Sequence, residues 1–170
     1  MKHLVTLFLF MSTLLVSAQD QVVQSSLKGL LSNNQNQISS LANAFSEEQY
    51  DWRPAAGVRS VGEVILHTAS ANYFLLSKLG YAIPKDVDLT GMEKIKGKQQ
   101  VLDALNKSFV FALEKMSEVK AEDFGKEVDL GFIKMNTLST MMVVLEHTGE
   151  HKGQLIAYAR SNGITPPWSN

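Results

Sequence analysis

Four apolar patterns with the period of an α-helix are the feature that most constrains how this chain can fold. Within each pattern, apolar residues recur at steps of three and four, which places them on one face of a helix. The patterns span residues 22–45, 60–80, 99–119 and 136–162. Because four amphipathic helices can bury these faces against one another, the sequence predicts an all-α fold, a four-helix bundle.

Local signals mark where two of these helices begin or end. Ser60 and Glu63 have the Ser-x-x-Glu form of a capping box, in which each side chain accepts a hydrogen bond from the backbone at a helix start. Gly80 and Gly163 follow the second and fourth patterns, and glycine tolerates the left-handed conformation with which many helices end. The second helix is therefore expected to begin after Ser60, and the fourth to end before Gly163.

The connections between the predicted helices differ in length. Residues 51–59 form a short connection, whereas residues 81–98 and 121–135 form long ones. Long crossover connections allow neighbouring helices of a bundle to run parallel. Residues 128–135 favour a short strand or one arm of a hairpin. No internal repeat, low-complexity tract or charge block points to a second domain.

Residues 1–18 have the pattern of a secretory signal peptide. A short positive start is followed by an apolar run over residues 4–16 and by small residues that end at Ala18. The run is shorter than the roughly 20 apolar residues that span a bilayer. We therefore expect cleavage before Gln19, so that residues 19–170 form one domain that is exported to the periplasm or the extracellular space.

The composition excludes several classes of partner and site. With 16 Lys and Arg against 17 Asp and Glu, the chain lacks the basic excess that neutralises nucleic-acid phosphates. It has no cysteine, which excludes disulfides, thiolate metal sites and a lipid anchor at the cleavage site. We therefore expect no nucleic-acid partner and no stable membrane anchor, and any metal ligands must be His or carboxylate side chains.

Three histidines remain after the expected cleavage, and all three fall in predicted helices. His67 lies in the second helix, and His147 and His151 lie in the fourth. A step of four residues turns a helix by only about 40°, so His147 and His151 project to one side. Together with His67 they would form the three-ligand site, with an open position, of a catalytic divalent metal ion. Spacing alone leaves open the alternative that each ring is a structural histidine.

Glu150 completes a second motif on the fourth helix. His147 to His151 reads H-x-x-E-H, a form used by zinc peptidases in which the Glu is the general base. Those enzymes take an acidic third ligand from further downstream, whereas the nineteen residues after His151 contain no Asp or Glu. We therefore do not expect a peptidase. Glu150 is a candidate catalytic base, and the alternative is a solvated side chain paired with Lys152.

Gln154 and Tyr158 continue the helical face that carries the two histidines. Gln154 follows His151 by three residues, and Tyr158 follows Gln154 by four. Both are candidates to orient a bound ligand or a water molecule beside the metal ion. The alternative for Tyr158 is a residue that only fills the core.

Four motifs, spread over nearly the whole of residues 19–170, form a recognisable set. They are Trp52-Arg53-Pro54, residues 58–67 ending in Leu66-His67, the run His147-x-x-x-His151-Lys152-Gly153-Gln154, and Asn162-Gly163-Ile164-Thr165-Pro166-Pro167. This set resembles the DinB-like family, also called the DinB/YfiT-like metalloenzymes. The resemblance implies a four-helix bundle with long crossovers, commonly a homodimer, in which three His hold a divalent ion such as zinc or nickel. Those roles fall on His67, His147 and His151.

The resemblance implies metal-dependent chemistry without defining one reaction. Characterised members include thiol-dependent S-transferases and a maleylpyruvate isomerase that uses a low-molecular-weight thiol. Those relatives act in the cytosol, where their thiol is made, whereas this chain is expected to be exported. We expect a metal-dependent hydrolase or a thiol-dependent S-transferase that acts on a small molecule. The alternative is a non-catalytic module that binds a metal ion or a small ligand.

Overall fold

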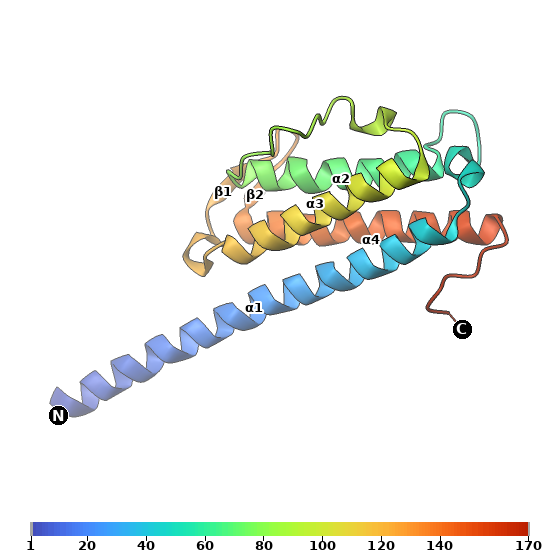
Figure 1. Cartoon of the computed structure of the whole chain (residues 1–170). Helices are drawn as coiled ribbons and strands as arrows, with labels where there is room; N and C mark the ends of the chain where they lie inside the picture. The colour runs from blue at the N-terminus through green and yellow to red at the C-terminus, as the bar shows by residue number, and fades with distance from the viewer. Residues whose placement is uncertain (1, 170) are drawn as a thin grey trace.

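The protein is a bundle of four long helices. The computed structural model describes the backbone of residues 2–169 and the side chains of residues 21–169, so the side chains of the expected signal peptide lie outside it. Within the described residues, no helix combines the length and the apolar character needed to cross a membrane. The helices are α1 (Lys2–Ala44), α2 (Val61–Lys78), α3 (Lys98–Glu118) and α4 (Thr137–Ser161), as Figure 1 shows. The all-α four-helix bundle predicted from the apolar patterns is confirmed.

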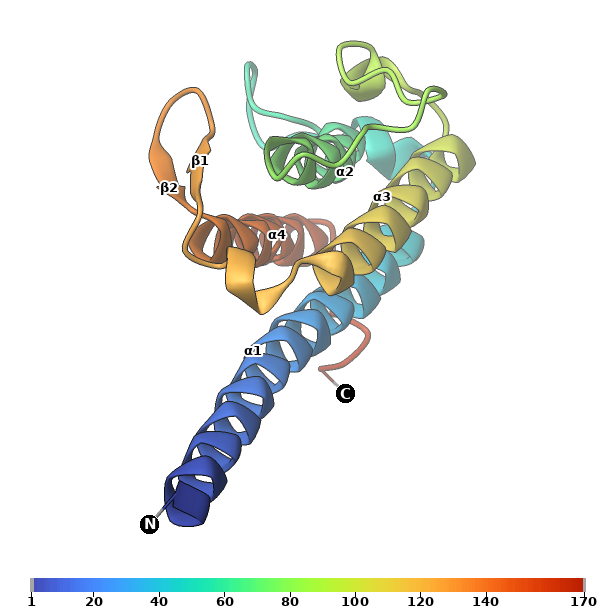
Figure 2. The ribbon, with the colours of Figure 1, turned by 90° about the vertical axis from the view of Figure 1, so that its left-hand side faces the viewer.

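Packing within the bundle places α2 beside α4. Both α1 and α2 pack against α3 and α4, and the N-terminal part of α1 extends beyond the other helices (Figure 2). Because the core is apolar and closely packed, the positions of α2 and α4 relative to each other are set by side chains from all four helices. Fully buried members of this core are Leu31, Ile38, Leu41, Ile65, Leu66, Leu76, Leu105, Phe109, Met116 and Met141.

The helix boundaries follow the local signals of the sequence. Ser60 Oγ accepts a hydrogen bond from the backbone N–H of Glu63 at 3.3 Å, and Glu63 Oε2 accepts one from the backbone N–H of Ser60 at 2.8 Å. These two bonds form the predicted capping box at the start of α2. At its end, Gly80 has a φ of +93°, the left-handed conformation expected after a helix. At the start of α4, Asn136 Oδ1 accepts a bond from the backbone N–H of Ser139 at 2.7 Å.

Both long crossovers are present, and each contains short elements. The connection from α2 to α3 includes a 3-10 turn, η2 (Met92–Lys94), which packs against α2. The connection from α3 to α4 includes an antiparallel hairpin of β1 (Glu127–Asp129) and β2 (Lys134–Asn136). The single strand or hairpin arm expected over residues 128–135 is therefore corrected, because this range contains parts of both strands and the turn at residues 130–133 between them. Of these elements, η2 is the one that matters for the site described next.

Candidate metal centre

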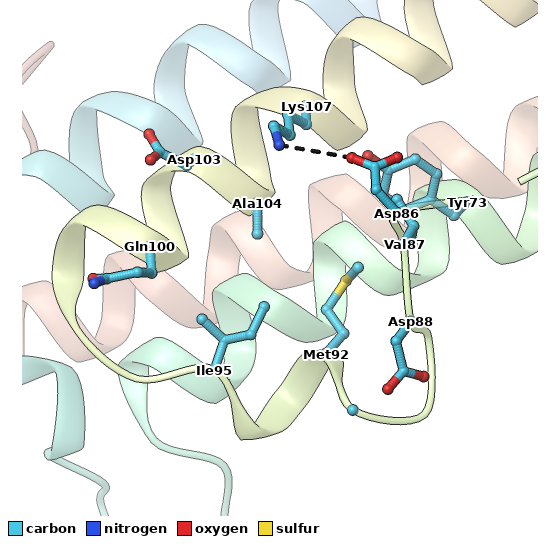
Figure 3. Close-up of a pocket in the computed structure, with 11 residues that line it drawn as sticks. Tyr73, Asp86, Val87, Asp88, Met92, Ile95, Gln100, Asp103, Ala104 and Lys107 are labelled. Atoms are coloured by element: carbon cyan, nitrogen blue, oxygen red, sulfur yellow. Dashed lines mark ion pairs between the residues drawn. The ribbon is translucent and has the colours of Figure 1, made fainter. Parts of the chain in front are cut away.

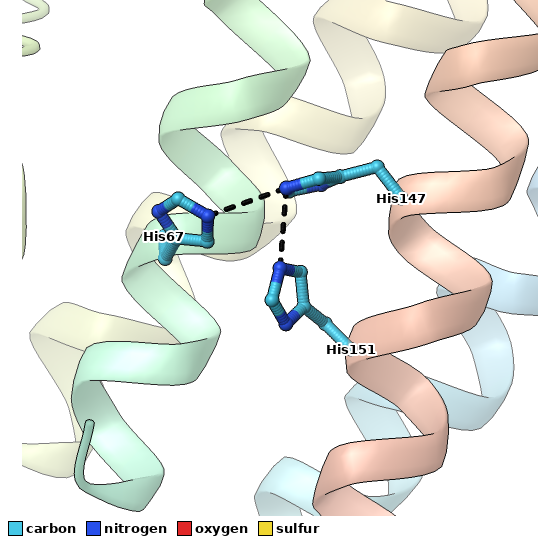
Figure 4. Close-up of side chains that lie close together, drawn as sticks. All are labelled: His67, His147 and His151. Carbon is cyan, nitrogen blue, oxygen red and sulfur yellow. Dashed lines mark hydrogen bonds between the residues drawn. The ribbon is translucent and has the colours of Figure 1, made fainter. Parts of the chain in front are cut away.

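The three histidines of the bundle converge from two helices. His67 comes from α2, and His147 and His151 come from α4 (Figure 4). Each can offer one ring nitrogen such that the three nitrogens all lie within 4.8 Å of one another. The Nε2 atom of His147 is 3.2 Å from Nε2 of His67 and 3.1 Å from Nε2 of His151. The rings that sequence spacing grouped together thus form a compact three-His cluster.

The spacing of these nitrogens fits a single metal ion. Two imidazole nitrogens bound to one tetrahedral Zn²⁺, with Zn–N bonds of 2.0–2.1 Å, lie about 3.3 Å apart. The separations at His147 differ from this value by about 0.1 to 0.2 Å. His151 meets the other two rings edge-on: the angle between ring planes is 89° with His67 and 74° with His147. Two of the three separations are therefore close to those of a bound ion, and the third lies within 4.8 Å, so the cluster could hold a divalent ion.

A glutamate of the crossover contacts the first ring of the cluster. Glu93, in η2, lies with Oε1 2.8 Å from Nδ1 of His67, and the Arg59 guanidinium donates to the same carboxylate at 3.2 and 3.3 Å. Partial burial acts to raise the pKa of Glu93, but hydrogen bonds from Arg59 and His67, together with their charges, lower it below its usual value. An ionised carboxylate can only accept, so His67 donates from Nδ1. In the neutral ring this leaves the lone pair on Nε2, the atom that faces the cluster.

The second ring is contacted from its own helix. Gln154 Oε1 lies 2.8 Å from Nδ1 of His151, and the Gln154 amide nitrogen donates to the Tyr158 hydroxyl at 2.9 Å. With its amide oriented in this way, Gln154 accepts from His151, whose Nε2 lone pair also faces the cluster. Gln154 therefore touches one of the rings directly, whereas Tyr158 touches Gln154.

The third ring has no such partner. Nδ1 of His147 is buried without a hydrogen-bond partner among the described residues. Burial, followed by the charges of His151, His67 and Arg59, lowers the pKa of His147 to about 4. Burial is also the main cause that lowers the pKa of His151. Both rings are thus neutral near pH 7, which is the form that binds metal ions.

Glu150 and Lys152 lie apart from this cluster. The Glu150 side chain is exposed, and no hydrogen bond joins it to the three rings within the described part of the chain. Lys152 donates instead to Asn34 Oδ1 at 2.7 Å and to Gln37 Oε1 at 2.9 Å, both on α1, so the alternative pairing with Glu150 is not formed. The carboxylate beside the cluster is Glu93, which sequence reasoning missed because no helical period relates a crossover residue to His67.

A cavity on the other side of η2 is separate from the histidines. It has a volume of about 510 Å³ and lies between the crossover and α3, with Met92, Ile95 and Ala104 among its lining residues (Figure 3). Asp86 and Lys107 stand at one end, 3.9 Å apart. None of the three histidines lines it. The turn η2 therefore contributes Met92 to the cavity and the next residue, Glu93, to the cluster.

The fold and the site together define a class of protein: a four-helix bundle with a three-His cluster that could hold a metal ion. The sequence matches the DinB family over residues 20–170, so the protein belongs to that family. The expected family resemblance is confirmed.

Individual relatives agree with this assignment. The chain is 26% identical over 142 residues to the uncharacterized protein YjoA of Bacillus subtilis (strain 168), covering 78% of this chain and 86% of YjoA. The crystal structure of a DinB-like protein from Bacillus cereus ATCC 10987 superposes with a TM-score of 0.70 at 20% identity, covering 84% of this chain and 96% of that one. YfiT from B. subtilis, described as a probable metal-dependent hydrolase with an unusual four-helix bundle topology, has a TM-score of 0.66 at 13% identity, covering 84% and 89%.

The lowered pKa of His147 predicts an acid-sensitive apoprotein. In the unfolded chain this ring titrates near pH 6.5, whereas in the folded protein its pKa is about 4. The unfolded state therefore binds the extra proton first, and the free energy of unfolding falls as the pH drops from about 6.5 towards 4. Urea unfolding of EDTA-treated protein should show a smaller acid-induced loss for His147→Gln than for wild type. Equal losses would contradict the prediction.

Proposed function

We propose that this protein is a metal-dependent hydrolase whose divalent ion is held by His67, His147 and His151 through their Nε2 atoms. The observation that carries the proposal is the convergence of these atoms, with separations of 3.1 and 3.2 Å at His147, from two helices. Zinc is the first choice and nickel the second, because imidazole suits both ions. The similarity to YfiT, a probable metal-dependent hydrolase, favours hydrolysis over thiol transfer.

The residues of the chain prepare this site in three ways. The rings of His147 and His151 are held neutral by burial, so protons compete weakly with a metal ion near pH 7. Glu93 and Gln154 accept the Nδ1 protons of two rings and so leave Nε2 as the ligand atom. His67, with 27% of its side chain exposed, keeps one edge of the cluster near solvent. A divalent ion bound there would supply Lewis acidity, which lowers the pKa of a bound water.

A second candidate function is metal or small-ligand binding without turnover. It is favoured by the position of the acidic residues near the cluster. Glu93 is engaged by Arg59 and His67, and Glu150 is exposed, so neither carboxylate is placed as a free general base beside the three rings. Hydrolysis would then depend on a base from solvent or substrate, and a binding module would need none.

Metal analysis tests the ligand set. Protein purified without an affinity tag or a nickel column should contain about one divalent ion per chain, whereas His147→Ala and His151→Ala should each bind it more than about 100-fold more weakly. The expected loss exceeds the 10- to 100-fold typical of residues that only orient a ligand. Glu150→Gln, an exposed change on the same helix, is the control and should retain the ion. Stoichiometric metal in both alanine variants would exclude these ligands.

Activity profiling separates the enzyme from the binding module. The protein loaded with Zn²⁺ or Ni²⁺ is assayed against esters, amides and lactones, and in parallel against electrophiles with a low-molecular-weight thiol. Hydrolysis that disappears in His151→Ala supports the proposal, and turnover seen only with the thiol would replace hydrolysis by transfer. If no substrate reacts while a small ligand raises the melting temperature, the protein is a binding module.

We also propose that the protein is exported and that the mature chain begins at Gln19. The charge, the apolar run and the small residues of positions 1–18 support the proposal. Fractionation of cells that express the full chain, followed by N-terminal sequencing, should find a product that starts at Gln19 outside the cytoplasm. Ala18→Arg, which removes the small residue before the cut, should block processing. An intact wild-type chain in the cytoplasm would refute export.

A further inference from the structure

Arg59 supports the first ring through its side chain. Its Nε and Nη2 atoms donate to the two oxygens of Glu93 at 3.2 and 3.3 Å, and Glu93 Oε1 accepts from His67 at 2.8 Å. This fork of two parallel bonds fixes the carboxylate plane better than one bond could. The orientation of the His67 ring therefore depends on Arg59 through Glu93.

Arg59 supports the second ring through its backbone. Its carbonyl oxygen accepts a hydrogen bond from the Tyr158 hydroxyl at 3.0 Å, and that hydroxyl accepts from the Gln154 amide at 2.9 Å. Gln154 in turn accepts from Nδ1 of His151 at 2.8 Å. The carbonyl of Arg59 can only accept, so the Tyr158 hydroxyl donates to it and accepts from the Gln154 amide nitrogen. The Gln154 amide oxygen is then left to accept, so His151 donates from Nδ1.

We propose that Arg59 and Glu93 are positioning residues, and that the two branches meeting at Arg59 form one network that directs the Nε2 lone pairs of His67 and His151 to the same point. This inference rests on the proposed metal-binding function. It adds two residues, one from the loop before α2 and one from the crossover, to the three that would bind the ion.

The loop that carries Arg59 is itself held in place. The backbone N–H of Val61 donates to the carbonyl of Trp52 at 3.0 Å, which closes the loop at the start of α2. The ring of Trp52 packs edge-on against that of Tyr158, with 5.3 Å between their centroids. The capping box at Ser60 follows Arg59 directly. The carbonyl of Arg59 therefore has a defined place opposite Tyr158.

His147 is the one ring of the three whose Nδ1 the network does not contact, so its proton position is set differently. When His67 and His151 both carry their proton on Nδ1, their two Nε2 lone pairs would repel a third lone pair at 3.1 and 3.2 Å. In the apoprotein His147 therefore carries its proton on Nε2 and shares it between the other two rings. To bind an ion, His147 alone must exchange this tautomer for the one with Nδ1 protonated.

The network should affect folding stability and metal affinity to different extents, and this difference makes the proposal testable. Arg59 and Glu93 are 44% and 38% exposed, so their ion pair contributes little to folding stability. Residues that orient metal-binding histidines typically change metal affinity by 10- to 100-fold. A positioning role thus predicts a large change in metal affinity with a small change in melting temperature.

The first experiment measures Zn²⁺ affinity of the full chain by competition with a chromogenic chelator. Glu93→Ala and Arg59→Ala should each weaken binding by about 10- to 100-fold, and the double variant should lose no more than Glu93→Ala alone, because both act on one branch. Glu93→Gln, which keeps an acceptor for His67, should recover part of the loss. Melting temperatures in EDTA should stay close to wild type.

Arg53→Ala is the matched control. Arg53 lies on the same loop, is 38% exposed and bonds to Val58 O and to Glu63, with which it pairs at 3.1 Å, so its hydrogen bonds reach neither Glu93 nor Tyr158, the two residues through which Arg59 reaches the rings. It should bind Zn²⁺ as wild type does. Equal affinity of wild type, Glu93→Ala and Arg59→Ala would overturn the inference, as would an equal loss in Arg53→Ala.

A second measurement needs no metal ion. Nitrogen NMR of the imidazoles in EDTA-treated protein identifies the protonated nitrogen of each ring. Wild type should show Nδ1–H for His67 and His151 and Nε2–H for His147. Glu93→Ala should change the tautomer of His67 alone, and Tyr158→Phe should change that of His151. Unchanged tautomers in both variants would overturn the positioning role. If wild type binds no ion yet shows these tautomer changes, the proposed function fails and the positioning role stands.

Discussion

The packing of α2 against α4 is the interaction on which the candidate centre depends. His147 and His151 share a helical face whatever the rest of the chain does, but a pair of rings is only two ligands. The third ring, His67, reaches them because the apolar core sets how far apart and at what rotation the two helices lie. The polar site is therefore positioned by apolar contacts that surround it.

Three imidazoles close together at the edge of an apolar core are costly to protonate, and their polar nitrogens need hydrogen-bond partners. Burial and mutual repulsion of the rings disfavour their charged forms, which the lowered pKa of His147 reflects. Glu93, from the crossover, and Gln154, from α4, satisfy Nδ1 of the other two rings. The result is a cluster in which burial keeps His147 and His151 neutral and ring nitrogens are directed at one another, an arrangement suited to a metal ion.

Much of the fold follows from short-range rules and was predictable. The helical periods, the capping box at Ser60 and the glycine after α2 all act within a few residues, so they can be read without knowing the tertiary structure. The same holds for the step of four between His147 and His151, and for Gln154 one turn further on. Membership of the DinB family adds the expectation that His67 joins this pair. These features required no knowledge of how the crossovers run.

The sequence by itself determined where α2 begins and ends, where α4 ends and which side chains share a face of α4, because each depends on backbone geometry over one or two turns. The start of the first helix was not determined in this way, because the pattern was expected to begin at residue 22 and α1 begins at Lys2. Only the tertiary structure decided that Glu93 contacts His67, that Arg59 joins the two rings and that Glu150 stands outside. Those contacts join residues far apart in the chain, whose spacing follows no helical period. The crossover and the loop that bring them together are positioned by packing against α2 and Tyr158. The positions of these residues follow from how the loop, the crossover and the helices pack together, which no local pattern encodes.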